Sequence, residues 1–196
     1  MRKTSVPARP AQPNQIRMNH ILDTATGLLI EKPNASLNEI AQQAGIGIAT
    51  LHRYVESREQ LMVRLGFRAI EVVRTAIAGV AFDEEQAERY VTDLIEALVP
   101  LGDKVHFLVH DASVNENPEI EQAYEKLRQP VMEAFERLRE RGVFRAELQP
   151  EWMWGTAYSL LFLAWEQIRA GVLAPRAAVS LVADTLCRGL GPDRRR

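Results

Sequence analysis

The sequence predicts an all-α protein. Apolar residues recur at helical spacing along most of the 196 residues, and no segment shows the alternation of apolar and polar residues that marks a half-buried strand. Hydrophobic residues make up 46% and charged residues 26% of the chain, as in ordinary folded proteins rather than disordered or membrane-embedded ones. At this length the chain forms either one large domain or two modest ones.

The first part of the chain predicts two helices joined by a short turn. Apolar residues at helical spacing predict a helix over residues 16–30, which Pro33 and Asn34 end. Ser36 is a favourable N-cap for a second helix, because its hydroxyl can accept a hydrogen bond from a free backbone N–H group. Gly45 ends that helix, since glycine readily adopts the left-handed conformation that is common there.

Two more helices begin shortly afterwards. Gly47 begins a short third helix that runs to about Tyr54. Ser57 and Gln60 have the spacing of a capping box and start a long fourth helix that ends near Val80. Four helix starts so close together predict a compact local bundle.

The rest of the chain predicts further helices. They cover residues 84–99, 103–110, 118–141, 151–170 and 175–190. Pro130 lies inside one of them and cannot donate a backbone hydrogen bond to Lys126, so it is expected to kink or divide that helix.

Residues 152–165 form the longest uncharged apolar block, which is fourteen residues long. A membrane-crossing helix needs about 20 residues, so this block is expected to be a buried helix. The apolar residues of this helix occur nearly all the way round its axis, which requires burial on more than one face.

Charge and cysteine content indicate a cytoplasmic protein with a cationic N-terminal part. The net charge is −2, yet residues 1–61 contain seven Lys and Arg against five Asp and Glu. Cys187 is the only cysteine, which excludes an intramolecular disulfide and suits a reducing compartment. The N-terminus lacks the apolar run of a signal peptide, so a cytoplasmic location is expected.

Residues 37–54 have the features of a helix-turn-helix, the motif that lays its second helix in the major groove of DNA. Gly45 permits a positive φ at the corner, and Ile40 and Leu51 can hold the two helices together. On the opposite side short residues let the backbone approach base edges, and Thr50 offers a hydroxyl. Because other helical corners share this pattern, a small-molecule-binding or protein-interaction module without DNA readout is the alternative.

The segment ASLNEIAQQAGIGIATLHRYVESREQL, with the preceding ILDTATGLL, resembles the N-terminal region of the tetracycline-repressor (TetR) family of bacterial transcriptional regulators. The matching features are Ile40-Ala41, Ala44-Gly45-Ile46, Ala49-Thr50-Leu51, the run from His52 to Tyr54, and Ser57-Arg58-Glu59 followed by Leu61. The rest of the chain matches only in plan. Three residues depart from the family pattern: His52 replaces a frequent tyrosine, Val55 a usual phenylalanine and Gly47 a common serine or threonine.

The resemblance implies a homodimer that binds operator DNA through two such heads and is released by a small molecule. It implies a DNA-binding domain over residues 16–61, joined by a long helix to a ligand-binding and dimerisation domain over residues 62–196. The residues expected at DNA are Arg17, Ser36, Gly47, Ile48, Ala49, Thr50, His52, Arg53, Tyr54 and Arg58. A repressor is expected, and an activator is the alternative; the sequence does not identify the operator, the regulated genes or the effector.

Residues 1–15 are expected to form a flexible basic arm. Arg2, Lys3 and Arg9, together with Arg17, suggest contact with the DNA backbone or minor groove beside the head. A disordered tail without DNA contact is the alternative.

A ligand pocket is expected between helices of the C-terminal bundle, where small-molecule sites often form. The candidates are His106, Phe107, His110, Tyr124, Tyr158 and Phe162. His106 and His110 share a helix face, but two histidines lack the further ligands of a metal site, so no metal or cofactor is expected. The aromatic residues are alternatively ordinary core, and the effector is expected to be partly apolar.

The last two helices are expected to form a four-helix interface in a symmetric dimer, which would supply the second DNA half-site. Burial inside a larger monomeric core is the alternative. The interface candidates are Leu161, Trp165, Ala178, Leu181, Val182, Thr185 and Leu186. The protein is not expected to be an enzyme, because the sequence contains no glycine-rich phosphate loop, zinc-protease signature or nucleophile elbow.

Overall fold

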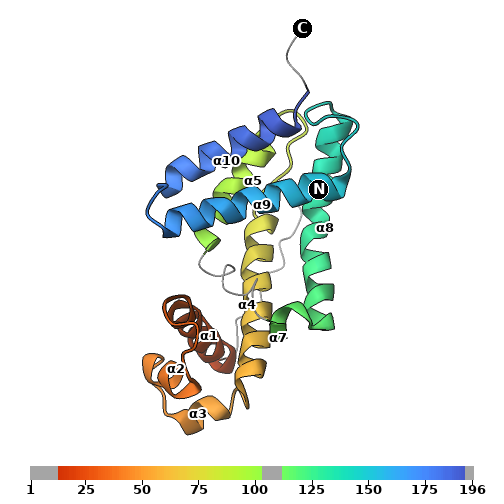
Figure 1. The fold of residues 1–196 in the computed structure, drawn as a ribbon. Coiled ribbons are helices and arrows are strands. Elements are labelled where there is room, and N and C mark those ends of the chain that lie inside the picture. The colour runs from red at the N-terminus through yellow and green to blue at the C-terminus, as the bar shows by residue number, and fades with distance from the viewer. Residues whose placement is uncertain (1–12, 103–111, 193–196) are drawn as a thin grey trace. The chain divides into compact units, whose positions relative to one another are not determined.

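The computed structural model describes residues 13–102 and 112–192. Its regular elements are all helical (Figure 1), which confirms the predicted all-α class for this part of the chain. The helices are α1 (Pro13–Glu31), α2 (Leu37–Gln43), α3 (Ile48–His52), α4 (Arg58–Ala78), α5 (Arg89–Leu98), the 3-10 helix η1 (Val99–Leu101), α7 (Ala112–Asn115), α8 (Pro118–Glu140), α9 (Pro150–Arg169) and α10 (Pro175–Leu190). Among the described residues no helix is both long and apolar enough to span a membrane.

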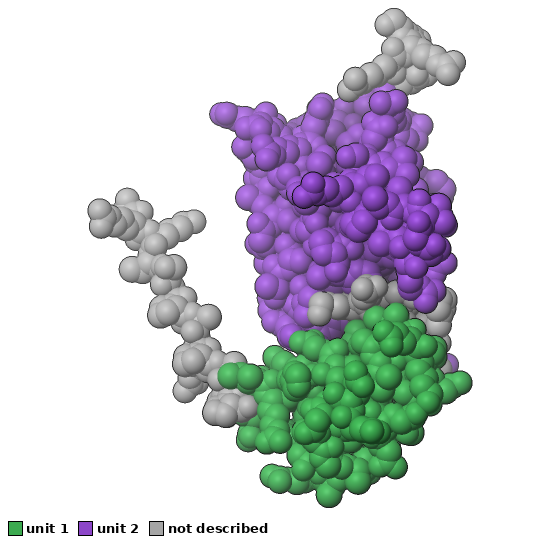
Figure 2. Space-filling model, turned by 90° about the vertical axis from the view of Figure 1, so that its left-hand side faces the viewer, with its two compact units in different colours: residues 1–61 green, residues 62–196 purple. Residues whose placement is uncertain are grey.

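The chain divides into two compact units, residues 1–61 (unit 1) and residues 62–196 (unit 2), which Figure 2 shows in different colours. Helix α4 begins in unit 1 and continues along the sequence into unit 2. Residues 1–12, which include most of the expected arm, and the helix expected over residues 103–110 lie outside the described residues. Helix α1 begins at Pro13, so the last residues of the expected arm are helical.

Unit 1 is a small helical bundle in which α2 packs against both α1 and α3. Its fully buried side chains include Ile21 and Leu29 of α1, Ile40 of α2 and Leu51 of α3. Val55 is also fully buried, so valine occupies a core position just beyond α3. These apolar contacts hold α1, α2 and α3 together.

A capping box starts α2. The Ser36 hydroxyl accepts a hydrogen bond from Glu39 N at 3.3 Å, and the Glu39 carboxylate accepts one from Ser36 N at 2.8 Å. The same carboxylate pairs with the Lys32 ammonium group. The hydrogen bond from Lys32, followed by those from Ser36, lowers the pKa of Glu39 to about 2. The predicted N-cap at Ser36 is therefore confirmed.

The start of α4 contains one half of its predicted capping box. The Ser57 hydroxyl accepts a hydrogen bond from Gln60 N at 3.1 Å. The Gln60 side-chain oxygen accepts from Glu56 N at 2.7 Å, rather than from the N-cap residue itself. Both side chains still accept hydrogen bonds from backbone N–H groups that have no partner within the helix at its beginning.

Unit 2 is built around α9 and α10, which lie side by side (Figure 1). Helix α9 also packs against α8, and α10 packs against α5. The core includes Phe135 of α8 and Phe144 of the following loop, which meet edge to face with their ring centroids 5.6 Å apart. This layered packing encloses most of the apolar side chains of the unit.

Two expectations about unit 2 need correction. Helix α5 begins at Arg89 rather than near residue 84. The preceding segment is held in turns, because the Asp83 carboxylate accepts from Glu85 N at 2.8 Å and Arg141 donates to the Glu84 carbonyl at 2.5 Å. Of the two effects expected of Pro130, a kink or a division of the helix, the division does not occur, because α8 runs unbroken through this exposed proline.

The indole of Trp165 is fixed against the end of α5. Its Nε1 donates a buried hydrogen bond to the Val99 carbonyl at 3.0 Å. A Cβ atom on Gly102 would lie only 2.3 Å from the Trp165 ring. Glycine at this position is therefore required for the close approach of backbone and indole.

The network of Lys32, Glu39 and Ser36 predicts that unit 1 loses stability in acid. The pKa of Glu39 is lowered from 4.5 to about 2 in the folded chain. Its contribution to the stability of unit 1 is therefore complete above pH 4.5 and is lost as the pH falls towards 2. We expect Lys32→Ala to raise the Glu39 pKa more than Ser36→Ala does, as measured by NMR titration of the carboxyl carbon. Arg53→Ala is the control, and an unchanged Glu39 titration in the first two variants would contradict the network.

Candidate functional site

The end of α2 fixes the corner between α2 and α3. Gly45 has a φ of +66°, in the left-handed region. The Gly45 N–H group donates to the Gln42 carbonyl at 3.1 Å, and the Ile46 N–H group donates to the Ala41 carbonyl at 2.9 Å. This pair of bonds is a Schellman motif. The predicted sharp stop at Gly45 is confirmed, and it separates the two short helices.

Helix α3 leaves small side chains open to solvent. Gly47 is its N-cap and contributes no side-chain hydrogen bond. Ala49 is exposed and Ile48 and Thr50 are half-buried, whereas Leu51 is fully buried. One face of α3 therefore anchors the helix in unit 1, and the other is free to approach a surface closely.

Most of the polar residues expected at DNA are accessible in unit 1. His52 and Arg53 are exposed at the end of α3, and Tyr54 beside them is half-buried. Arg17 of α1 is exposed. Ser36 is exposed too, but its hydroxyl is already engaged in the α2 capping box. The structure thus leaves Arg53 and His52 as the most accessible donors next to α3.

Arg58 is placed differently from the expectation that it faces DNA. Its Nη1 donates to the Ala35 carbonyl at 2.6 Å, and its Nη2 donates to the Pro33 carbonyl at 2.5 Å. Both carbonyls belong to the turn between α1 and α2. Both terminal nitrogens of the guanidinium therefore bind unit 1 itself.

Unit 2 contains an apolar cavity with a volume of about 330 Å³, within the size range of small-molecule sites. Its walls come mainly from α4, α8 and α9 and are lined almost entirely by apolar and aromatic side chains. The lining includes Gly66, Ala69 and Val73 of α4, Tyr124 of α8, and Trp154 and Tyr158 of α9. Glu121, whose side chain is exposed, adds a carboxylate to the lining.

A row of aromatic rings forms one wall of this cavity. Trp154 lies between Tyr124, 6.1 Å away in an edge arrangement, and Tyr158, 6.4 Å away in a stacked one. Burial raises the pKa of both tyrosine hydroxyls, so they are neutral at physiological pH and can donate hydrogen bonds. The wall therefore offers flat π surfaces together with two hydroxyl groups.

Some of the expected pocket residues line this cavity. Tyr124 and Tyr158 do so, whereas Phe162 stacks on Tyr158 without being part of the lining. His106, Phe107 and His110 lie outside the described residues. Trp154 was missed, although it lies four residues before Tyr158 on the same face of a helix. The small residues of α4 were also missed, because small residues inside a helix carry no distinctive signal.

The expectation about which residues form the dimer interface needs a correction. Five of them are at most 7% exposed within their own subunit: Leu161, Trp165, Ala178, Val182 and Leu186. Their side chains are taken up by the unit 2 core, and Leu161 and Trp165 also line the cavity. Leu181 and Thr185 are exposed, as the prediction requires. The large exposed apolar residues of α9 are instead Trp152 and Leu163.

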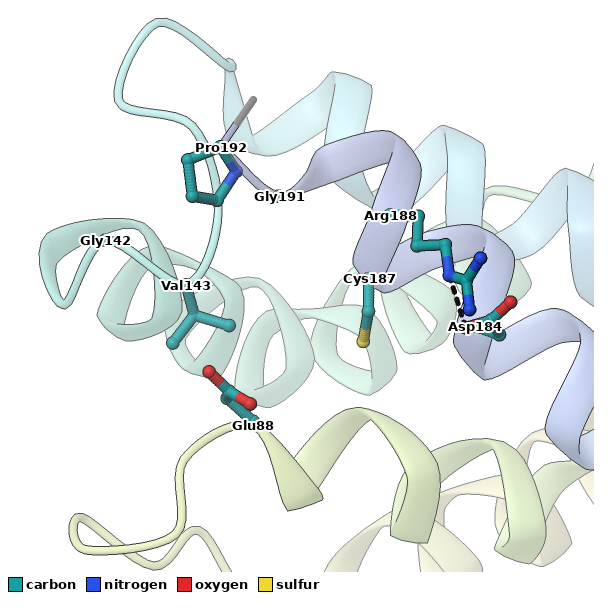
Figure 3. Close-up of a pocket in the computed structure, with 8 residues that line it drawn as sticks. All are labelled: Glu88, Gly142, Val143, Asp184, Cys187, Arg188, Gly191 and Pro192. Carbon is teal, nitrogen blue, oxygen red and sulfur yellow. Dashed lines mark ion pairs between the residues drawn. The ribbon is translucent and has the colours of Figure 1, made fainter. Parts of the chain in front are cut away.

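A second hollow, with a volume of about 530 Å³, lies beside α10 (Figure 3). Cys187 of α10 and Glu88 line it, and Asp184 forms an ion pair with Arg188 at 2.7 Å. Burial, followed by the nearby Glu88 and Asp184 carboxylates, raises the pKa of the Cys187 thiol. The thiol is therefore a poor nucleophile. Because small-molecule sites are mainly apolar, we select the aromatic cavity rather than this charged hollow as the candidate ligand site.

Comparisons with known proteins relate both the sequence and the fold to transcriptional regulators. No family model matches the chain. The transcriptional repressor LfrR of Mycolicibacterium smegmatis is 26% identical over 152 residues, which are 78% of this chain and 79% of LfrR. The crystal structure of the TetR-like regulator LfrR from Mycobacterium smegmatis in complex with proflavine has a TM-score of 0.76 and 24% identity, and the match covers 90% of this chain and 98% of that one.

A second solved structure extends the comparison. The TetR-family regulator PfmR from Thermus thermophilus has a TM-score of 0.70 and 19% identity, and the match covers 89% of this chain and 99% of that one. These similar proteins are transcriptional regulators rather than enzymes. The TetR-like motif at residues 35–61 agrees with three findings, which are the sequence similarity to a repressor, the shared fold and the corner at Gly45. The chain is therefore similar in sequence to a transcriptional repressor, and in fold to TetR-like transcriptional regulators of bacteria.

Proposed function

We propose that this protein is a dimeric repressor that releases its operator when a small, largely apolar molecule enters the cavity of unit 2. One observation carries the proposal: a single chain combines an open helix-turn-helix corner in one unit with an aromatic cavity in the other. Unit 1 is then the DNA-binding domain, and unit 2 the ligand-binding and dimerisation domain. A repressor of this kind acts on the chromosome in the bacterial cytoplasm.

Helix α3 supplies the proposed DNA contact. The small residues Ala49 and Thr50 allow the helix to enter the major groove closely, and Ile48 can contact a thymine methyl group. Arg53 and His52 lie next to this face, where they can bind phosphate oxygens or base edges. The separate burial of Leu51 supports this orientation, because α3 stays anchored while its other face contacts DNA.

A flat aromatic molecule suits the cavity best. The rings of Trp154 and Tyr158 can stack on a planar ligand, the two tyrosine hydroxyls can orient it, and Glu121 favours a positive charge. The similar regulator LfrR has been crystallised with proflavine. We therefore propose a planar, aromatic effector and use proflavine as the probe.

The position of α4 supports coupling between the two sites. Helix α4 starts in unit 1, and its residues Gly66, Ala69 and Val73 line the cavity in unit 2. A ligand that displaces α4 therefore acts on the chain segment that leads directly to the DNA-binding helices. A coupling free energy of about 1 to 3 kcal/mol is enough to change operator affinity roughly 5- to 150-fold.

We propose that the exposed faces of α9 and α10 form the dimer interface. Trp152 is 63%, Leu163 53% and Leu181 55% exposed, which is a large apolar surface to leave in water. Thr156 and Ser159 lie between Trp152 and Leu163 along α9, and their small side chains allow a second helix to pack closely. These residues replace the buried ones that the sequence analysis assigned to the interface.

The DNA proposal is tested by selecting genomic fragments that bind the protein and measuring their affinity over a range of salt concentrations. We expect Arg53→Ala to weaken operator binding about 10-fold and Thr50→Ala to change which fragments are selected. Arg176→Ala, which removes an exposed arginine of unit 2, is the control. If both α3-side variants select and bind the same fragments as the unaltered chain, DNA is not read through α3. If the unaltered chain selects no fragment, the protein is a helical module without DNA readout.

The effector proposal is tested by fluorescence titration with proflavine. We expect Tyr158→Ala to weaken proflavine binding about 10-fold, because it removes a stacking surface from the cavity wall. Ala69→Leu should have a similar effect by filling the cavity, while Phe82→Leu, outside the cavity, should have none. Wild-type affinity in both cavity variants would place the binding site elsewhere.

The dimer proposal is tested by sedimentation equilibrium. Burying Leu163 and Leu181 contributes about 1.5 to 3 kcal/mol for each side chain, so Leu163→Arg with Leu181→Arg should weaken dimerisation at least about 100-fold. Val172→Arg, which alters an even more exposed apolar residue beyond α9, is the control. Dimerisation that is weakened by the control but not by the double variant would reject this surface.

A further inference from the structure

The first residue of α4 is bound to a turn that lies more than twenty residues earlier in the chain. The Arg58 guanidinium donates from two different nitrogens to two carbonyls, at 2.6 Å to Ala35 and 2.5 Å to Pro33. Ala35 is fully buried, so this end of the turn belongs to the core of unit 1. The two hydrogen bonds join the beginning of α4 to the α1–α2 turn within one compact unit.

The geometry of these hydrogen bonds requires an arginine. A guanidinium group is a rigid planar fork, so one side chain can reach two carbonyls whose residues are two apart in the sequence. Hydrogen bonds from a charged donor are stronger than those between neutral groups. A lysine keeps the charge but presents a compact ammonium group without the fork.

The same turn determines how α2 begins. Ser36, the N-cap of α2, directly follows Ala35, and its capping partner Glu39 also binds Lys32 on the other side of the turn. Since α2 is joined to α3 by the fixed corner at Gly45, the orientation of α3 depends on the position of this turn. Arg58 therefore links the first turn of α4 to the element that sets the orientation of α3.

We propose that Arg58 is a positioning residue that holds the α1–α2 turn, and through it α3, in register with the start of α4, and that it does not bind a DNA phosphate. The inference rests on the proposed function, because it assigns a role in DNA binding. The family motif suggested the opposite role for this residue, since Arg58 belongs to the matched Ser57-Arg58-Glu59 segment. The two roles make different demands on charge and shape, which separates them experimentally.

The test compares Arg58→Lys and Arg58→Gln with the unaltered chain, using a selected operator fragment at several salt concentrations. If Arg58 positions the turn, both variants weaken binding about 10-fold. The slope of affinity against salt then stays unchanged, because the protein neutralises the same phosphates as before. If Arg58 binds phosphate, Arg58→Lys retains most of the affinity and Arg58→Gln reduces the slope by about 0.9 for each phosphate that is no longer neutralised. That result would overturn the proposal.

A measurement on the unaltered chain covers the case in which the variants fail to fold. NMR of the operator complex should show the Arg58 guanidinium protons close to residues 33 and 35, as in the free protein. Their transfer to DNA phosphates in the complex would overturn the proposal even without a folded variant. Failure of the unaltered chain to select any DNA fragment would instead reject the proposed function, so the two failures are distinguishable.

Discussion

The left-handed conformation of Gly45 is the constraint on which unit 1, the proposed DNA-binding domain, depends. With the φ of Gly45 at +66°, the backbone forms the two hydrogen bonds that end α2. The chain can then begin α3 after only a short turn. Ile40 and Leu51 can then both be buried in unit 1 although they lie on different short helices. A residue with a side chain at this φ would be strained, and the corner would open. The small exposed face of α3 is therefore a consequence of a local backbone requirement and of the core beneath it.

Unit 2 meets a different requirement, because the proposed ligand site needs empty space inside a well-packed helical bundle. Ala69 on α4 lines the cavity with a small side chain, and Gly66 lets α4 approach the Ile120 side chain, to which a Cβ atom on Gly66 would be only 2.8 Å away. The aromatic rings of α8 and α9 form a wall, and Trp165 is fixed by its hydrogen bond to Val99 and by the close approach of Gly102. Rings held in this way lose little freedom when a ligand binds, which favours affinity.

The fold of this chain is close to that of similar regulators although the sequence identity is low. Identity to LfrR is 26% over 152 residues, whereas the fold agrees with a TM-score of 0.76. Helix packing depends on which positions are apolar and on volume, and these properties tolerate extensive substitution. Residues that line the cavity or lie on the open face of α3 are not constrained by packing in the same way, so the proposed effector and operator can differ from those of other proteins with this fold.

The sequence by itself determined the features that depend on neighbours within about one helical turn. These are the all-α class, the caps at Ser36 and Ser57, the stop at Gly45 and the ends of most helices. Only the tertiary structure decided which face of α9 is buried, because a helix that is apolar all round gives the same periodicity for every face. Leu161 and Trp165, which were expected at the interface, lie in the core, whereas Trp152 and Leu163 are exposed. The tertiary structure also decided the partner of Arg58 and the late start of α5, since both depend on groups far apart in the chain, and spacing along a sequence carries no information about such contacts.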